Sequence, residues 1–191
     1  SGPDPDKITI TGVVDDEGPN SPIANVNCRF VDLDTKVHDT ALSASNGSYR
    51  LQVPPDVQGY ILCSPQSLSN LTLATFSSTV GLGAGSTITS EDVTPTTTVV
   101  ADIIRYLKPA YPTGHKLKLL NDIDTNQDPY LVMVVAMAKR LYQTMLSMQV
   151  NVEFGGDRDD DGDDPMDDRP DGGGVGGDAG DGADFSPLPD A

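Results

Sequence analysis

VHDTALSASNGSYRLQV, residues 37–53, carries the clearest fold signal in this chain of 191 residues. At its centre lies Asn46-Gly47, a pair that tolerates the positive φ angles needed at both central positions of a type I′ turn. Strand-forming residues flank the pair on both sides. We therefore predict a β-hairpin in which residues 37–43 and 48–53 are the two strands.

Further short strands are predicted before and after this hairpin. Lys7 to Val14 forms the first, Ile23 to Asp32 the second, and Gln58 to Cys63 begins the strand after the hairpin. Short strands separated by Gly, Pro, Asn and Asp are typical of a small β-sandwich. We predict a mainly β fold with an N-terminal linker over residues 1–6 and a sandwich domain over residues 7–92.

Three segments of this region also carry a family resemblance: Ile10-Thr-Gly12-Val-Val, Pro22-Ile-Ala-Asn-Val26 and Ala44-Ser-Asn-Gly47-Ser-Tyr49-Arg-Leu51-Gln-Val53-Pro54. Together they resemble the carboxypeptidase regulatory-like (transthyretin-like) domains of secreted and surface proteins. The resemblance implies a Greek-key β-sandwich of the transthyretin/Ig-like type. It also implies a role as a spacer, stalk or adhesion module.

The chain has two cysteines, Cys28 and Cys63, and each lies in an apolar, strand-like run. In an oxidising compartment, such a pair is expected to form a disulfide between neighbouring strands. The alternative is two buried free thiols. The disulfide prediction favours a secreted or cell-surface protein.

A helical segment packed on the sandwich is predicted over residues 93–150. Its first helix begins after Thr94, a good capping residue, with Pro95 in the first turn and apolar residues through Leu107. Pro109 and Pro112 are expected to end this helix.

Asp128-Pro129 provides a cap and a first position for the strongest helix, Tyr130 to Val150. We expect core packing for its methionines, the alternative being an adaptable binding groove. The apolar face predicted to be buried comprises Leu131, Val134, Val135, Ala138, Leu141, Met145 and Met148.

The last 37 residues, 155–191, consist almost entirely of Asp, Gly and Pro. They hold 13 of the 29 acidic residues against two arginines, a formal charge of −11 out of −17 for the chain. This composition cannot form an apolar core. Crowded carboxylates favour a hard divalent cation with oxygen ligands, so we predict an irregular, acidic, calcium-binding C-terminal tail over residues 151–191.

An Asp-x-Asp-x-Asp-Gly motif opens this tail at Asp157. In such a loop alternate side chains turn toward Ca²⁺ and the glycine makes the sharp bend. The run through Asp171 resembles thrombospondin type 3 repeats, which implies an extracellular calcium site. The alternative is that the motif arises by chance in an Asp/Gly-rich segment and binds no ion. The predicted ligands are Asp157, Asp159, Asp161, Asp163 and Asp168.

Charge and motif content exclude several function classes. A net charge of −17 would repel the phosphate backbone of a nucleic acid. The longest apolar run, Tyr130 to Ala138, is too short for a membrane span. His38 and His115 belong to no metal or catalytic motif, and the chain lacks tryptophan. We therefore predict a protein that is not an enzyme.

The lead hypothesis is a non-catalytic, extracellular, calcium-binding structural protein that forms a surface filament or matrix as a homopolymer. The tail, or the segment from Ile8 to Val14, would add a strand to the exposed sheet edge of a neighbouring copy. The alternative is a glycan- or cell-wall-binding accessory module of a surface protein.

Overall fold

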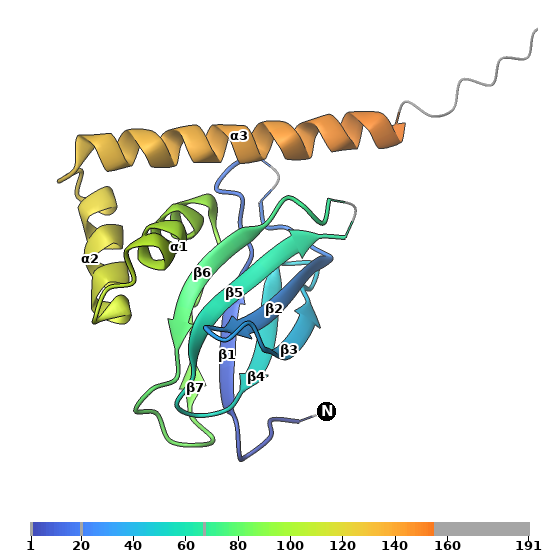
Figure 1. Cartoon of the computed structure of the whole chain (residues 1–191). Coiled ribbons are helices and arrows are strands. Elements are labelled where there is room, and N and C mark those ends of the chain that lie inside the picture. Colours follow the sequence, from blue (N-terminus) through green and yellow to red (C-terminus); the bar gives the residue numbers. More distant parts are fainter. Residues whose placement is uncertain (1, 20, 67, 155–191) are drawn as a thin grey trace, which may run out of the picture. The chain divides into compact units, whose positions relative to one another are not determined.

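The computed structural model describes residues 2–19, 21–66 and 68–154. In this part of the chain seven strands form two sheets, and three helices follow them (Figure 1). The predicted calcium tail lies outside the described residues from residue 155 onward. The strands are β1 (Ile8–Val13), β2 (Val26–Asp32), β3 (Val37–Leu42), β4 (Ser48–Val53), β5 (Gln58–Pro65), β6 (Leu73–Ser78) and β7 (Thr87–Ile88).

One sheet has four strands in the order β3-β2-β5-β6, and all its neighbours are antiparallel. The other has three strands in the order β4-β1-β7, with β4 antiparallel and β7 parallel to β1. β2, β4 and β5 point alternate side chains toward the space between the sheets, where they form one core with side chains of β1. The prediction of a mainly β fold is confirmed. The fully buried core side chains include Ile10, Val26, Cys28, Phe30, Leu51, Val53, Ile61 and Cys63.

The hairpin predicted for residues 37–53 is wrong, although both of its strands exist. β3 pairs with β2 in the four-stranded sheet, whereas β4 pairs with β1 in the other, so the turn between them crosses from sheet to sheet. Crossing allows β4 to bury Tyr49, Leu51 and Val53 between the sheets, while β3 remains a largely exposed edge. The two strands still touch, because Asp39 Oδ2 accepts a hydrogen bond of 2.7 Å from the Gln52 amide.

The turn itself also differs from the prediction. The Gly47 amide donates to the Ala44 carbonyl at 2.8 Å, and Gly47 has a φ of 74°. Asn46 keeps a negative φ, so this is not a type I′ turn. Gly47 is required here because a Cβ would lie 2.8 Å from the Val14 carbonyl oxygen, in addition to the unfavourable φ.

The segment near Ile8–Val14 is not free to extend a neighbouring sheet. It forms β1, the central strand of its sheet, and Ile8 and Ile10 are fully buried. Donating β1 to another copy would therefore remove the middle of the fold.

The predicted disulfide between Cys28 and Cys63 is present, with a Cα–Cα distance of 4.1 Å. The two residues lie directly opposite each other on β2 and β5. Because the bond joins strands in the middle of the core, it crosslinks the four-stranded sheet at its centre. A structural disulfide of this kind is typical of proteins that function outside the cytosol.

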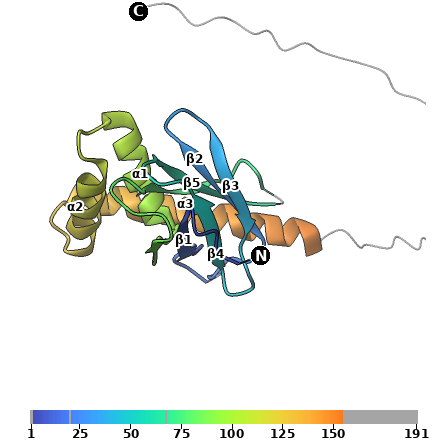
Figure 2. The same cartoon turned by 90° about the horizontal axis from the view of Figure 1, so that it is seen from below.

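α1 (Pro95–Leu107) begins where the sequence predicts. The Thr94 hydroxyl accepts from the Thr97 amide at 3.1 Å, and the Thr97 hydroxyl accepts from the Thr94 amide at 2.9 Å. This reciprocal pair satisfies backbone donors that no helical turn could reach. α1 packs against β6, and α1 and α2 lie on the β6 side of the sheets, away from β3 and β4 (Figures 1 and 2).

α2 (Pro112–Asp124) was not predicted, because Pro112 was interpreted as a helix end. Pro112 instead occupies the first turn of a new helix, where its missing amide and fixed φ cost nothing. The sequence of α2 lacks a strong amphipathic pattern, and none of its side chains is fully buried.

α3 (Pro129–Phe154) also starts as predicted, with Asp128 Oδ1 accepting from the Leu131 amide at 3.1 Å. It crosses one end of the sheets (Figure 1). Its predicted buried face is only partly right, because Leu141, Met145 and Met148 are exposed. Core packing is therefore wrong for them, and Met133 and Met137 are exposed as well. The side chains that α3 does bury are Leu131, Val135, Tyr142 and Leu146, with Val134 and Ala138 half-buried.

Candidate functional site

The predicted calcium ligands, Asp157 to Asp168, lie outside the described residues. Within residues 2–19, 21–66 and 68–154, no three His, Cys, Asp or Glu side chains gather closely enough to hold a metal ion. In the same residues, no helix combines the length and apolarity needed to cross a bilayer. The candidate sites are therefore two surface hollows, two buried polar clusters and one exposed helix face.

The first hollow is a groove of about 880 Å³ on the outer face of the four-stranded sheet, beside α1. β2, β5 and β6 supply an apolar floor that includes Val31, Leu62 and Phe76. Its cations, Arg29, Arg105 and Lys108, form no ion pair within the described part of the chain. The groove therefore combines an apolar surface with positive charge.

Tyr60 is the aromatic side chain best placed for binding in this groove. It packs edge-to-face on Phe76, with ring centroids 5.5 Å apart. Burial raises the pKa of the Tyr60 hydroxyl, Arg105 opposes the rise and Asp102 adds to it. The hydroxyl therefore stays protonated at neutral pH and can donate a hydrogen bond to a ligand.

One carboxylate of the groove, Asp32, is already engaged. It lies 2.6 Å from His38 Nε2 and accepts from the amides of Asp34 and Lys36, both at 2.9 Å. The His38 hydrogen bond, followed by the Lys36 amide, lowers the pKa of Asp32. These contacts close the turn between β2 and β3. His38 lies in this turn, whereas His115 is exposed on α2. Neither histidine belongs to a group that could hold a metal ion within the described residues.

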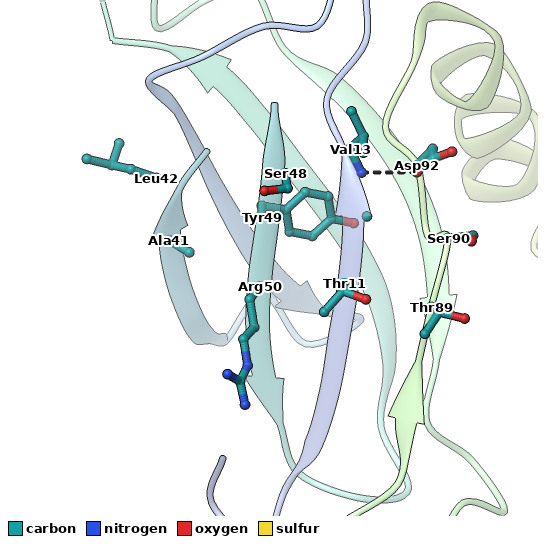
Figure 3. A pocket seen from close by; sticks show the side chains of 11 residues that line it. Thr11, Val13, Ala41, Leu42, Ser48, Tyr49, Arg50, Thr89, Ser90 and Asp92 are labelled. Atoms are coloured by element: carbon teal, nitrogen blue, oxygen red, sulfur yellow. Dashed lines mark hydrogen bonds between the residues drawn. The ribbon is translucent and has the colours of Figure 1, made fainter. Parts of the chain in front are cut away.

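The second hollow, of about 710 Å³, lies over the outer face of β4-β1-β7 (Figure 3). Thr11, Ser48 and Thr89 supply hydroxyls, and Arg50 supplies the cation. Asp92 is used by the backbone, because its Oδ1 accepts from the Val13 amide at 3.0 Å. The result is a polar, hydroxyl-lined surface.

This hollow contains no activated nucleophile. The Ser48 hydroxyl donates to Asn46 Oδ1 at 2.7 Å, and no histidine or lysine lines the hollow. A serine needs an adjacent base to attack a substrate. The arrangement suits weak polar binding better than covalent chemistry.

The first buried polar cluster joins α2 to the sheets. Lys116 pairs with Glu91 and also donates to the Phe76 carbonyl at 2.7 Å. The Ser77 hydroxyl donates to Glu91 Oε2 at 3.3 Å, and the Tyr49 hydroxyl donates to the Glu91 carbonyl. Since the charged groups already have protein partners, we interpret this cluster as a clamp that holds α2 in place.

The second polar cluster lies beneath α3. Asp16 is fully buried; its Oδ1 accepts from the Gly18 amide at 3.0 Å, but its Oδ2 has no partner among the described residues. The hydroxyl of Tyr142 on α3 is also buried and unpartnered there. Burial, reinforced by the Asp16 charge, raises the pKa of Tyr142 well above the usual tyrosine value. Gln143 holds α3 on this loop by donating to the Asp16 and Glu17 carbonyls, both at 3.2 Å.

The exposed helix face belongs to α3. Opposite its contact with the core, α3 presents a row of large apolar side chains, which we call the outer α3 stripe. Sequence reasoning placed half of this row in the core, because the helix is apolar on more than one side and periodicity alone does not say which side faces the sheets. The stripe comprises Tyr130, Met133, Met137, Leu141, Met145 and Met148.

This chain has a distant likeness to a solved structure. No protein-family model matches the sequence, and no curated protein matches it. The structure titled "Crystal Structure of S.CueP" matches with 14% sequence identity and a TM-score of 0.33. The match covers 46% of this chain and 62% of that chain, less than two thirds of its length. A likeness of this size carries no argument about fold or function.

Proposed function

We propose that this protein is a non-catalytic, extracellular structural protein that associates with copies of itself, as a subunit of a surface filament or matrix. The observation that carries the proposal is the outer α3 stripe. A helix that is apolar on two faces is normally covered on both, and α3 is covered by its own sheets on only one. Apolar surface of this kind marks an interaction site.

The fold and its crosslink support an extracellular setting. Two sheets enclosing a disulfide suit a rigid module outside the cell, because structural disulfides form mainly in oxidising compartments. The finer assignment, a Greek-key sandwich of the carboxypeptidase regulatory-like kind, rests on the sequence resemblance. Such modules serve as spacers, and none of the polar clusters described above requires a substrate.

Calcium binding is the second part of the proposal. Asp157, Asp159, Asp161, Asp163 and Asp168 have the spacing of a calcium loop, and the local charge density favours a divalent cation. Bound Ca²⁺ would remove part of the repulsion between the acidic tails of neighbouring copies. Association would then strengthen with calcium.

Sedimentation velocity tests this function. The full chain is measured in millimolar CaCl₂ and again after chelation, and both mass and frictional ratio are followed. Large species that form with calcium and dissolve without it are the expected result. A protein that stays monomeric at high concentration in saturating calcium would refute the proposal.

A second candidate function, a glycan- or cell-wall-binding module, is favoured by the groove beside α1. Tyr60 offers a ring face and a hydroxyl, and Arg105 offers a cation for an acidic sugar. The test is a pull-down on insoluble cell-wall polysaccharide with wild type, Tyr60→Ala and Arg105→Ala. Lys36→Ala, an exposed cation outside the groove, is the matched control. Equal retention of all four proteins would exclude the groove.

A further inference from the structure

We propose that two copies of this chain pair through the outer α3 stripe, with their α3 helices antiparallel and a twofold axis at the level of Lys139. The inference rests on the proposed self-association and names one of its contact surfaces; because a twofold contact closes on two copies, growth beyond the dimer needs a second contact, for which the calcium-binding tail is proposed. The twofold contact does not involve calcium, so the two proposals can fail separately.

The first argument is the spacing of the exposed residues. Successive steps of four and three residues connect Tyr130, Val134, Met137, Leu141, Thr144 and Met148. This is the alternation of the a and d positions of a heptad, the pattern with which one helix packs along another. Met133 and Met145 flank this seam on its two sides.

Exposure supports the same surface. Tyr130, Met137, Leu141 and Met148 are 73%, 64%, 63% and 64% exposed, although each has an apolar body. Polar side chains such as Gln143, by contrast, lie on the side that meets the Asp16–Glu17 loop. In the described structure the seam is therefore exposed at every position except Val134, which is half-buried.

The second argument is that the seam is symmetric in the sequence. In an antiparallel pair about residue 139, residue i faces residue 278 − i of the other copy. Tyr130 then faces Met148, Val134 faces Thr144, and Met137 faces Leu141. The flanking Met133 lies at the level of Met145 of the other copy but on the other side of the seam, because the twofold axis keeps each flank beside its own counterpart. Tyr130, Met137, Leu141 and Met148 each meet another apolar residue, as a self-complementary twofold interface requires.

Charge identifies the partner as a second copy. The chain carries −17, so two copies repel each other except where their surfaces are neutral. The seam from Tyr130 to Met148 has no acidic residue, and its two cations are Lys139 and Arg140. Lys139 pairs with Glu17 of its own chain at 3.4 Å.

A membrane surface fits this face less well. An interfacial helix needs several cations flanking its apolar side to attract anionic lipids, and α3 has two along its seam. The rest of the chain would be repelled by the same lipids.

The length of the seam indicates how tightly the two copies should bind. From Tyr130 to Met148 the seam is about 27 Å long at ~1.5 Å per residue. A contact of one helix pair of this length lies at the lower end of stable interface sizes, near ~1,200 Å² in total. We therefore expect a dissociation constant in the micromolar range.

Sedimentation equilibrium of the full chain in chelator tests the contact. Wild type is compared with Met137→Glu and Leu141→Glu across 1 to ~300 μM protein, a range that brackets a micromolar constant. Leu117→Glu is the matched control, because Leu117 is similarly exposed but lies on α2. We expect wild type and the control to dimerise and the two stripe variants to bind at least tenfold more weakly.

Two outcomes would overturn this proposal. In one, wild type is monomeric in chelator at the highest concentration. In the other, the stripe variants associate as strongly as the control. If wild type still forms calcium-dependent assemblies in either case, the proposed function survives and only this interface is wrong. Circular dichroism of each variant confirms that the exposed substitutions leave the fold intact.

Cysteine crosslinking tests the orientation independently of variant affinity. Tyr130→Cys combined with Met148→Cys places the thiols of two copies opposite each other only in the antiparallel pair. These two positions are about 27 Å apart along one helix at ~1.5 Å per residue, so they cannot crosslink within a chain. Tyr130→Cys alone should stay uncrosslinked, because a seam residue faces its own counterpart only in a parallel pair, and its efficient crosslinking would refute the antiparallel orientation. The native cysteines do not interfere, because Cys28 and Cys63 are buried and bonded to each other.

Discussion

Replacing Tyr142 with phenylalanine should make the protein more stable. The Tyr142 hydroxyl is buried and has no hydrogen-bond partner among the described residues. A buried hydroxyl without a partner costs roughly 1–3 kcal/mol, and phenylalanine fills the same space without it. We expect Tyr142→Phe to raise the free energy of unfolding by about 1 kcal/mol at pH 7, or ~3 °C in Tm.

Tyr49→Phe is the matched control. Tyr49 is equally buried, but its hydroxyl donates to the Glu91 carbonyl. Removing this donor leaves a carbonyl with one partner fewer, so the free energy of unfolding should fall by about 1 kcal/mol. The two substitutions delete the same atom, and only the presence of a partner distinguishes their expected effects.

Alkaline pH should increase the advantage of Tyr142→Phe. Burial and the Asp16 charge raise the pKa of Tyr142 in the folded state, whereas the unfolded residue ionises near pH ~10. Above that pH the unfolded wild type loses a proton that the folded state retains, so its stability falls as pH rises. A variant without the hydroxyl is free of this loss, and its advantage should grow by about 1 kcal/mol by pH 11.

Urea unfolding at pH 7, 9, 10 and 11, followed by circular dichroism, measures these effects. The decisive comparison is the sign of the change for the two variants at pH 7. If Tyr142→Phe lowers the midpoint by as much as Tyr49→Phe does, the Tyr142 hydroxyl makes a stabilising contact, for example through a water shared with Asp16. Our account of the buried pair would then be wrong.

Three further changes test other parts of the fold. Cys28→Ala with Cys63→Ala opens a loop with a sequence separation of 35. It should lower the free energy of unfolding by about 4 kcal/mol in chemical denaturation, and a loss below ~1 kcal/mol would contradict a stabilising crosslink. Thr94→Ala removes the reciprocal cap of α1 and should cost about 1 kcal/mol, with faster amide exchange in the first turn of that helix. Lys116→Met leaves the Glu91 carboxylate without its cation in a mostly buried position and should cost about 2 kcal/mol. Faster exchange confined to α2 would confirm the clamp, whereas an unchanged exchange pattern would argue against it.

Sequence signals predicted the structure correctly where the stabilising contacts are made by residues close together in the sequence. Thr94 with Pro95 predicted the start of α1, and Asp128 predicted the start of α3, because a cap satisfies amides within the next few residues. The positions of β1 to β5 followed from short runs of strand-forming residues between turn residues, whereas β6 and β7 were not predicted. Cys28 and Cys63 were predicted to pair because both sit in such strands, and the structure pairs them.

The sequence alone did not decide which strands pair. Residues 37–53 have the local pattern of a hairpin, yet β3 and β4 belong to different sheets. Pairing β4 with β1 buries the apolar side of both strands in one core, and this gain outweighs the preference of Asn46-Gly47 for a type I′ turn. α2 was missed for a related reason: its helix depends on contacts such as that of Lys116 with Glu91, not on an amphipathic pattern.

The candidate site, too, was decided partly by the sequence and partly by the tertiary structure. From its composition and spacing, the sequence alone determined that this protein has a β-rich, disulfide-linked region, an apolar helix after residue 129 and an acidic tail with a calcium motif. Only the tertiary structure decided that α3 turns Tyr142 and Leu146 into the core and leaves Met137 and Leu141 outside. A helix with apolar residues on several sides has no single preferred face. The packing of the sheets selects one, and the outer stripe is the face it leaves exposed.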